Sequence, residues 1–249
     1  MNPQAYTEMA RVQDSHWWYA ARRCILRNRL KRLQLPADAL ILEVGSGTGA
    51  NLGLLAEFGT VVGLEMTAEA IAIAQAKCVN PRSVTLIQGR CPQDLGSLKQ
   101  RFDLICLFDV LEHIEQDRIS LERLTALLKP GGKLMLTVPA YPWMWGPHDE
   151  HVHHKRRYTR QSVAACCANA GLAVSWISHF NTLLFPLAVL ERVREKLTGR
   201  RGAGTETPPR PLNAALGAIF AFEQHMLAHI PMPFGLSLLV LAQPGTANE

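Results

Sequence analysis

Three glycines at alternate positions, Gly45, Gly47 and Gly49, directly follow the apolar run Leu40–Val44. Glycine lets the backbone adopt positive φ angles and lets a ligand approach without meeting a Cβ atom. A helix-competent segment begins at Leu52, so the free N–H groups of its first turn would point at the same ligand. A strand, a glycine-rich turn and a helix in this order are typical of nucleotide-binding sites.

Two acidic residues near this turn favour different ligands. Glu65 lies 20 residues after Gly45 and ends the next apolar run, where a dinucleotide-binding fold carries its ribose-binding acid. Glu43 lies inside the first run, two residues before Gly45. A carboxylate there resembles the E/D-x-G-x-G motif of class I S-adenosylmethionine (SAM) dependent methyltransferases, where it marks the methionine end of the cofactor.

Two later segments are similar to the same family. Residues 102–114, FDLICLFDVLEHI, and residues 127–134, LLKPGGKL, stand in the family's order and spacing, and the resemblance covers residues 38–140. It implies a Rossmann-like, doubly wound α/β sheet of seven strands, SAM as the cofactor, and methyl transfer. The residues that it implies around the cofactor are Glu43, Gly45, Ser46, Gly47, Gly49, Glu65, Met66, Arg90, Cys91 and Asp109.

One of these positions departs from the family pattern. The residue after Gly89 is commonly an Asp that binds the adenine amine, and here it is Arg90. Adenine recognition would then fall to backbone N–H groups around Cys91, or to the side chains of Gln88 or Gln93, with Met66 at the adenine edge. Asp109 ends the fourth strand, at the rim where related methyltransferases place groups near the transferred methyl.

Residues 139–158 leave the fifth strand at its ligand end, so we expect them to overhang the cleft. They contain aromatic, histidine, acidic and basic side chains within twenty positions. Four interpretations compete. In the first, a histidine is the general base that deprotonates the acceptor. In the second, the basic side chains bind an anionic group on the substrate. In the third, four side chains bind a metal ion, and in the fourth the segment is only a structural lid.

Acceptor binding with a histidine base is the favoured interpretation. The candidate bases are His151 and His154, with His113 on the turn after Asp109 as a third candidate or a brace for the loop. A metal ion on His148, Asp149, His151 and His153 is least favoured, because no Cys partner or helical H-x-x-x-H spacing supports it, and no metal is predicted. The predicted substrate-binding residues are Trp17, Trp18, Tyr141, Trp145, Arg156, Arg157 and Tyr158.

Two short motifs also point to a narrower group. The tract D-x-x-x-H-H-x-R-R-Y at residues 149–158 resembles a bacterial methyltransferase subgroup that often carries H-W-W near its start, as residues 16–18 do here. The alternative for the aromatic residues of this second motif is that they anchor their helix to the core.

Hydrophobic periodicity places these residues on elements. Strands are predicted at 40–44, 60–65, 83–89, 104–108, 133–138, 172–180 and 234–242. Helices are predicted at 16–35, 52–58, 68–78, 116–128 and 159–170. The last strand is expected to run antiparallel beside the sixth, and residues 181–233 are a helical insertion before it. In the insertion, apolar helices at 181–197 and 212–230 bracket a basic loop.

Charge and cysteine usage limit the class of protein. The net charge is +5, with 7 Lys/Arg against 2 Asp/Glu in residues 1–32 and 10 against 5 in residues 151–249, while residues 33–150 carry 9 against 14. Basic flanks suit lipid headgroups, phosphates or nucleic acid, or are simply solvated faces. The six Cys form no C-x-x-C, which indicates reduced thiols in a cytosolic protein. No apolar run suggests a signal peptide or reaches the length of a spanning helix.

We therefore predict a single methyltransferase domain over 1–249. Its parts are an N-terminal helical cover at 1–37, a SAM-binding core at 38–180, a cap at 181–233, the last strand at 234–242 and a tail at 243–249. The acceptor is a small or lipid-linked molecule, and the protein is cytoplasmic. The cap is a candidate for peripheral membrane or lipid-substrate contact, and the alternative is that its helices pack on the domain or form a dimer interface. The alternatives are an NAD(P)-binding oxidoreductase and a non-catalytic SAM-binding partner protein. Nucleic-acid methylation is disfavoured by the lack of an N/D-P-P-Y motif.

Overall fold

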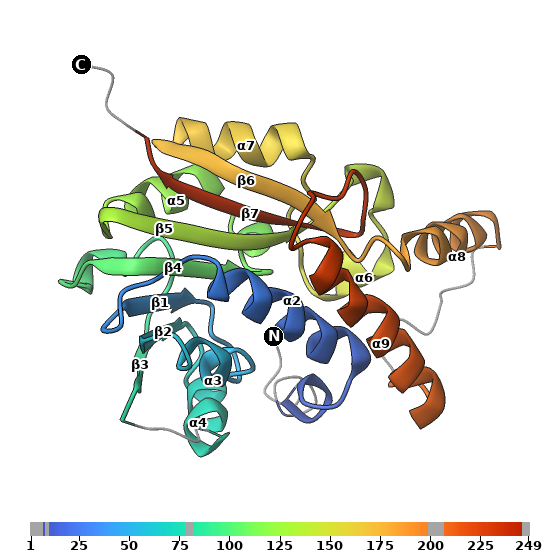
Figure 1. Ribbon diagram of the computed structural model, residues 1–249, viewed down its shortest axis with the longest axis horizontal. Helices are drawn as coiled ribbons and strands as arrows, with labels where there is room; N and C mark the ends of the chain where they lie inside the picture. The colour runs from blue at the N-terminus through green and yellow to red at the C-terminus, as the bar shows by residue number, and fades with distance from the viewer. Residues whose placement is uncertain (1–6, 8–9, 78–81, 199–206, 246–249) are drawn as a thin grey trace.

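The computed structural model describes residues 7, 10–77, 82–198 and 207–245. They form one seven-stranded sheet with helices on both faces (Figure 1). The strands are β1 (Leu40–Val44), β2 (Thr60–Glu65), β3 (Val84–Gln88), β4 (Phe102–Phe108), β5 (Leu128–Pro139), β6 (Leu172–Phe180) and β7 (Ser237–Pro244). The α-helices are α2 (Trp17–Lys31), α3 (Leu52–Leu55), α4 (Ala68–Lys77), α5 (Asp117–Thr125), α6 (Pro147–His151), α7 (Arg160–Asn169), α8 (Phe185–Thr198) and α9 (Arg210–Met226). Short 3-10 turns are η1 (Leu95–Ser97), η2 (Leu111–His113) and η3 (Pro142–Met144).

The strand order is β3-β2-β1-β4-β5-β7-β6. The first five strands pair in parallel, whereas β7 runs antiparallel to both β5 and β6. The predicted doubly wound, Rossmann-like sheet and the antiparallel last strand are confirmed. The carboxyl ends of β1, β2, β4 and β5 share one edge, which is where a doubly wound sheet binds ligands.

Two apolar cores cover the two faces of the sheet. One joins the sheet to α5 and α7, through residues such as Leu121 and Val163. The other joins it to α2, α3 and α9, through residues such as Leu26 and Phe220. Figure 1 shows α2 and α9 packed side by side across this second face, while α8 projects from the body. Because α2 crosses the face beside the carboxyl edge, its side chains can reach the glycine turn.

Several predicted element ends are wrong for local reasons. α2 stops at Lys31 instead of residue 35, because Gln34 has a left-handed φ of 51° and Pro36 follows. α9 ends at Met226, short of 230, since Pro231 and Pro233 cannot continue a helix. β5 begins at Leu128, which pairs with Phe102, instead of at the predicted residue 133. The Pro130-Gly131-Gly132 segment therefore lies inside the bounds of the strand.

The predicted helix at 159–170 is confirmed as α7 together with its two cap residues. Thr159 caps α7, its Oγ1 accepting a 3.0 Å hydrogen bond from the backbone N–H of Ser162, and Gly171 follows that helix with φ 75°. The predicted last strand is shifted, because β7 begins at Ser237 instead of residue 234 and continues to Pro244, two residues into the predicted tail. The first residues of the lead-in, the centre of the predicted basic loop (199–206) and the last tail residues (246–249) lie outside the described residues.

Candidate active site

The glycine turn has the backbone that its sequence predicts. Gly45, Gly47 and Gly49 have φ angles of 69°, 52° and 85°, a region that disfavours any side chain. A Cβ on Gly45 would lie 2.6 Å from Cγ2 of Val110, so the turn packs tightly against the segment after β4. A Cβ on Gly47 would meet nothing within 4 Å. The turn is therefore closed at Gly45 and open to a ligand at Gly47.

Glu65 fixes the shape of this turn. Its Oε2 accepts a 3.0 Å hydrogen bond from the N–H of Gly47, and its Oε1 accepts one of 3.0 Å from the N–H of Thr67. Each carboxylate oxygen keeps a further lone pair, so the predicted binding of ribose hydroxyls remains compatible with these contacts. Met66 is 54% exposed beside it and is available for an adenine edge.

Glu43 is buried at the start of the turn with half of its carboxylate unsatisfied. Oε1 accepts a 2.9 Å hydrogen bond from Nδ2 of Asn51, while Oε2 and the Oδ1 of Asn51 have no hydrogen-bond partner among the described residues. Burial raises the pKa of Glu43 to about 7, although the hydrogen bond from Asn51 and the positive charge of Arg22 both lower it. Two orphaned buried acceptors beside a glycine turn fit an ammonium group, such as that of the methionine part of SAM.

Arg22 reaches this edge from α2. Its guanidinium forms an ion pair with Asp109 at the end of β4 and lies 4.7 Å from the ring centre of Trp18. Asp109 has a φ of 56°. The hydroxyl of Thr137 accepts a hydrogen bond from the N–H of Asp109 and donates one to its Oδ1. Burial lowers the pKa of Arg22 to about 10, although its electrostatic interactions with Tyr19, Glu43 and Glu112 raise it. The pair joins the N-terminal helix to the rim of the site.

A second group of polar side chains lies just beyond Asp109. Glu112 and His113 are on η2, and the ring centre of His154 lies 4.7 Å from that of His113. Nδ1 of His154 is 2.8 Å from Oδ1 of Asp149, which also accepts a 2.7 Å bond from Nε of Arg157. The structure thus brings two of the three predicted bases together, and leaves His151 exposed on α6.

The buried charges in this group shift one another's protonation. Burial raises the pKa of Glu112 to about 8. Burial, with the charge of His154, lowers the pKa of His113 to about 4, so this imidazole is neutral near pH 7. Burial would raise the pKa of Asp149, but its hydrogen bonds to His154 and Arg157 outweigh this and hold it well below its usual range. Asp149 is therefore a carboxylate that can only accept hydrogen bonds.

Three predicted substrate-binding residues have partners within the protein. Arg156 forms a 2.6 Å ion pair with Asp117, and the buried hydroxyl of Tyr158 donates to the same carboxylate at 2.9 Å. Arg157 is bound to Asp149, and its Nη1 donates to the carbonyl of Ala140. These contacts hold residues 139–158 onto the sheet edge, which favours the structural-lid interpretation for all three.

The predicted aromatic residues divide between two places. Trp17 packs edge-on against Phe220 of α9, which favours the anchoring interpretation. Tyr141 stacks on His179 at 5.2 Å and lies 5.5 Å from Phe185 at the start of α8. Trp145 is half-buried on the segment before α6. The aromatic group around Tyr141 therefore joins the lid to the insertion.

The segment after β3 is held by an acid that the sequence analysis did not single out. Oδ2 of Asp94 accepts a 2.7 Å hydrogen bond from the backbone N–H of Arg90. Burial raises the pKa of Cys91 to about 11, so its thiol stays protonated and unreactive. Arg22 and Asn51 were also missed. Only Asn51 carries a signal, since it follows the glycine turn directly.

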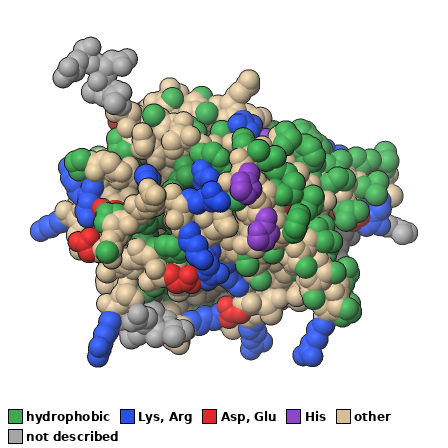
Figure 2. All heavy atoms as spheres, viewed as in Figure 1, with side chains coloured by type: hydrophobic (Ala, Val, Ile, Leu, Met, Phe, Trp, Pro, Cys, Tyr) green, Lys and Arg blue, Asp and Glu red, His purple; other side chains and the backbone are tan. Residues whose placement is uncertain are grey.

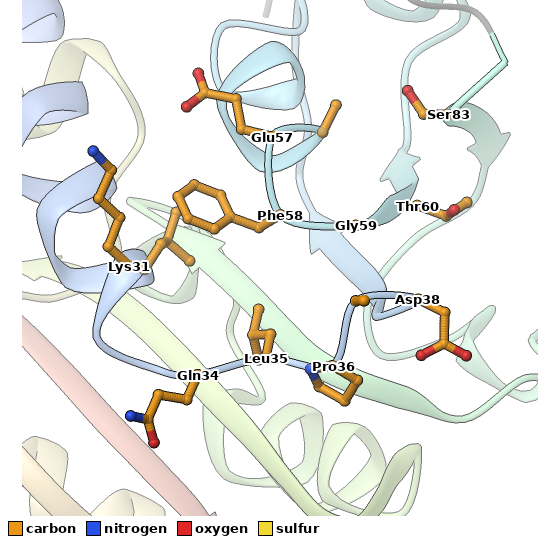
Figure 3. A pocket seen from close by; sticks show the side chains of 13 residues that line it. Lys31, Gln34, Leu35, Pro36, Asp38, Glu57, Phe58, Gly59, Thr60 and Ser83 are labelled. Carbon is orange, nitrogen blue, oxygen red and sulfur yellow. The ribbon is translucent and has the colours of Figure 1, made fainter.

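A surface pocket of about 580 Å³ lies elsewhere. Figure 3 shows its lining, which includes Lys31, Asp38, Phe58 and Thr60, at the amino ends of β1 and β2. This is the sheet edge opposite the glycine turn, so the pocket is separate from the candidate site.

Comparisons with known proteins bear on the family and the fold of the chain. The methyltransferase domain family matches residues 17–175. The demethylmenaquinone methyltransferase of Tropheryma whipplei (strain Twist) is 30% identical over 134 residues, covering 53% of this chain and 51% of that protein. The dTDP-3-amino-3,6-dideoxy-alpha-D-glucopyranose N,N-dimethyltransferase of Streptomyces fradiae is 36% identical over 157 residues, covering 60% and 54%. The ubiquinone biosynthesis O-methyltransferase of Coxiella burnetii (strain RSA 493 / Nine Mile phase I) is 32% identical over 141 residues, covering 52% and 60%.

The chain thus spans about half to three fifths of the length of these curated relatives. A solved SAM-dependent methyltransferase from Clostridium acetobutylicum ATCC 824 has the same fold, with a TM-score of 0.61 at 12% identity, covering 97% of this chain and all of that one (100%). Another, from Mesorhizobium loti, has a TM-score of 0.53 at 18% identity, covering 86% and 95%. The family match indicates SAM as the cofactor. The chain belongs to the methyltransferase domain family and has the fold of the class I SAM-dependent methyltransferases.

Proposed function

We propose that this chain transfers a methyl group from SAM to a small-molecule or lipid-linked acceptor. The observation that carries the proposal is the buried, half-satisfied carboxylate of Glu43 beside a glycine turn that is open at Gly47. SAM, when bound, would supply an electrophilic methyl group to a lone pair of the acceptor, with the neutral thioether S-adenosylhomocysteine as the leaving group. The protein's contribution is then mainly alignment of the two reactants.

Each end of the cofactor has a proposed set of residues. Glu43 with the turn Gly45–Gly49 holds the methionine end, and Glu65 the ribose. Met66 and the backbone of Arg90 and Cys91 border the adenine. Asp109 stands at the methyl end, and the cluster of Glu112, His113 and His154 acts on the acceptor. We also infer membership of the subgroup marked by H-W-W and H-H-x-R-R-Y, because both motifs are present, at residues 16–18 and 153–158.

An apolar acceptor is favoured by the surface of the insertion. α8 has no buried residue, and Figure 2 shows hydrophobic side chains gathered on the side of the molecule where α8 projects. The large apolar side chains exposed on α8 and α9 are Leu187, Leu190, Val193, Leu197, Leu212, Ile219 and Phe222. Two of the similar proteins are named for menaquinone and ubiquinone biosynthesis. We propose that this surface receives the apolar tail of the acceptor or rests on the lipid that contains it.

No helix in the described ranges is long and apolar enough to cross a bilayer. Contact with lipid through α8 and α9 would therefore be peripheral. Lys196 near the end of α8 and Arg210 at the start of α9 would add attraction to anionic headgroups.

Transfer of a labelled methyl group tests this proposal. Purified protein is incubated with methyl-tritiated SAM and with either a lipid extract or a water-soluble extract of a bacterium. Label that moves into the organic phase from the lipid extract supports the proposal, and a Glu43→Gln variant should abolish most of it. Label that is transferred only to macromolecules, or to neither extract although SAM binds, would contradict it.

A further inference from the structure

Three side chains with metal-ligating atoms meet beside the carboxyl end of β4. Among the residues that the structure describes, Glu112, His113 and His154 form a group whose ligand atoms all lie within 4.8 Å of one another. We propose that this cluster binds a divalent transition-metal ion, such as Zn²⁺ or Co²⁺, through one carboxylate and two imidazoles. Such a donor set suits these ions, and three protein ligands leave coordination positions open.

Glu112 is the residue that most requires a ligand. Its side chain is 0% exposed, and neither oxygen has a hydrogen-bond partner in the described part of the chain. The nearest ring nitrogen of His154 is 3.8 Å from Oε1, which is beyond hydrogen-bond distance. A buried carboxylate without a partner is costly, and a bound cation removes that cost.

His154 is oriented so that one ring nitrogen can reach an ion. Asp149 accepts hydrogen bonds from Nε of Arg157 and from the N–H of Gly146, so Nδ1 of His154, at 2.8 Å from Oδ1 of Asp149, meets an acceptor. The other ring nitrogen, Nε2, lies 3.8 Å from Oε1 of Glu112 and is the atom that would bind the ion. A carboxylate that orients an imidazole in this way is the usual support for a metal-binding histidine. Asp149 is itself fixed by Arg157 and by the N–H of Gly146.

The spacing of the group is close to what one ion needs. Two ligand atoms at about 2.1 Å from a tetrahedral ion lie roughly 3.4 Å apart. The 3.8 Å between Nε2 of His154 and Oε1 of Glu112 is near this value, and atoms as much as 4.8 Å apart would have to approach by roughly 1.4 Å. Small side-chain rotations of the half-buried His113 supply such a movement.

Nearby positive charges are already balanced. Arg22 is paired with Asp109 and Arg157 with Asp149, so neither guanidinium is left to repel a cation. The cluster also differs from the set of lid residues considered from sequence. Of those, His151 is exposed, and both oxygens of Asp149 accept hydrogen bonds from within the protein.

The metal site does not depend on the proposed methyl transfer. Where both hold, an ion here stands on the acceptor side of Asp109 and supplies Lewis-acid polarisation of an acceptor oxygen. Its binding and the binding of SAM are measured separately, so that either proposal can fail alone.

Cobalt titration tests the site. The purified 249-residue chain is treated with a chelator, desalted, and titrated with Co²⁺ while its visible absorption and the number of ions bound per chain are recorded. We expect one ion per chain, ligand-field bands typical of nitrogen and oxygen donors, and displacement of Co²⁺ by Zn²⁺. A folded wild-type chain that binds no Co²⁺ would overturn the proposal, and the cluster would then be a base without metal.

Variants locate the bound ion. Glu112→Gln and His154→Ala should each weaken Co²⁺ binding more than tenfold, and Asp149→Asn by about 10–100-fold, because it supports the ligand without touching the ion. His229→Ala, at an exposed histidine after α9, is the matched control and should bind as wild type does. Circular dichroism confirms that each variant is folded, and His113→Ala provides a further ligand variant if one of the others does not fold. Equal binding by folded ligand variants and the control would show adventitious surface binding and contradict the proposal.

Discussion

Asn51 donates a 2.9 Å hydrogen bond from Nδ2 to Oε1 of Glu43, and the two residues stand on either side of the glycine turn. The contact uses one carboxylate oxygen and leaves the other buried without a partner. It thus fixes the Glu43 carboxylate beside the turn while leaving one oxygen able to bind a cationic group. We propose that this group is the ammonium of the methionine part of SAM.

The two ends of the glycine turn should respond differently to a methyl group. Gly45→Ala places a Cβ against Val110 at positive φ, and we expect it to lower the free energy of unfolding by about 2–5 kcal/mol. Gly47→Ala meets no neighbour and should cost only about 1–2 kcal/mol, from its φ of 52°. It should nevertheless weaken SAM binding at least about tenfold, or about 1.4 kcal/mol, since its Cβ enters the ligand space.

Denaturant unfolding and SAM titration of both variants check this pair. If Gly47→Ala bound SAM as tightly as the wild type, the ligand would not approach the turn at that residue.

Protonation of Glu43 should make stability depend on pH. Its pKa rises from 4.5 in the unfolded chain to about 7 in the folded one, so the folded state holds a proton that the unfolded state has lost between these values. The stabilising contribution is therefore full below pH 4.5 and is lost as pH rises through 7, by up to about 3 kcal/mol.

Glu43→Gln removes this titration and serves as the comparison. We expect the stability of the wild type relative to Glu43→Gln to fall between pH 5 and pH 8, measured by urea unfolding without SAM. A difference that does not change with pH would mean that Glu43 is already ionised at pH 5.

Tyr158 should act on the lid and not on the acceptor. Removing its hydroxyl in Tyr158→Phe breaks the bond to Asp117, and we expect a loss of about 1–3 kcal/mol of stability, since that partner is charged. The KM for an acceptor should stay within about twofold of wild type, a change below 0.5 kcal/mol. If Tyr158→Phe instead raised the KM tenfold and left the stability unchanged, Tyr158 would bind the substrate, as the sequence predicts.

The sequence predicts the framework of this site better than its contacts. Apolar runs and glycines specify β1, the turn and β4, since strands and positive φ angles depend on local residue types. Which of the many basic residues near the N-terminus is buried depends on how α2 packs across the sheet, and nothing in the sequence distinguishes Arg22. The prediction that Arg156 binds substrate failed to anticipate a similar contact within the fold. Its ion-pair partner, Asp117, lies 39 positions earlier in the chain, so the local sequence gives no sign of the pair.

The exposed face of α8 should affect methyl transfer to apolar acceptors and not to soluble ones. Leu190 is 67% exposed, so Leu190→Glu should leave the melting temperature unchanged. We expect it to reduce methyl transfer to an acceptor in lipid vesicles several-fold, while transfer to a short-chain soluble analogue continues. Gln161→Glu adds the same charge at an exposed site of α7 and is the control. Equal loss with both acceptors would place the effect at the active site.

Cofactor binding tests the central claim most directly. Calorimetric titration of the purified chain with SAM, S-adenosylhomocysteine and NAD⁺, in parallel with Glu43→Gln and Glu65→Ala, reports ligand identity and the two acidic contacts together. The account predicts binding of the first two ligands and none of NAD⁺, with affinity for SAM at least about tenfold lower in each variant, from one lost charge-assisted contact. Binding of NAD⁺ alone, or SAM binding that neither variant weakens, would contradict it.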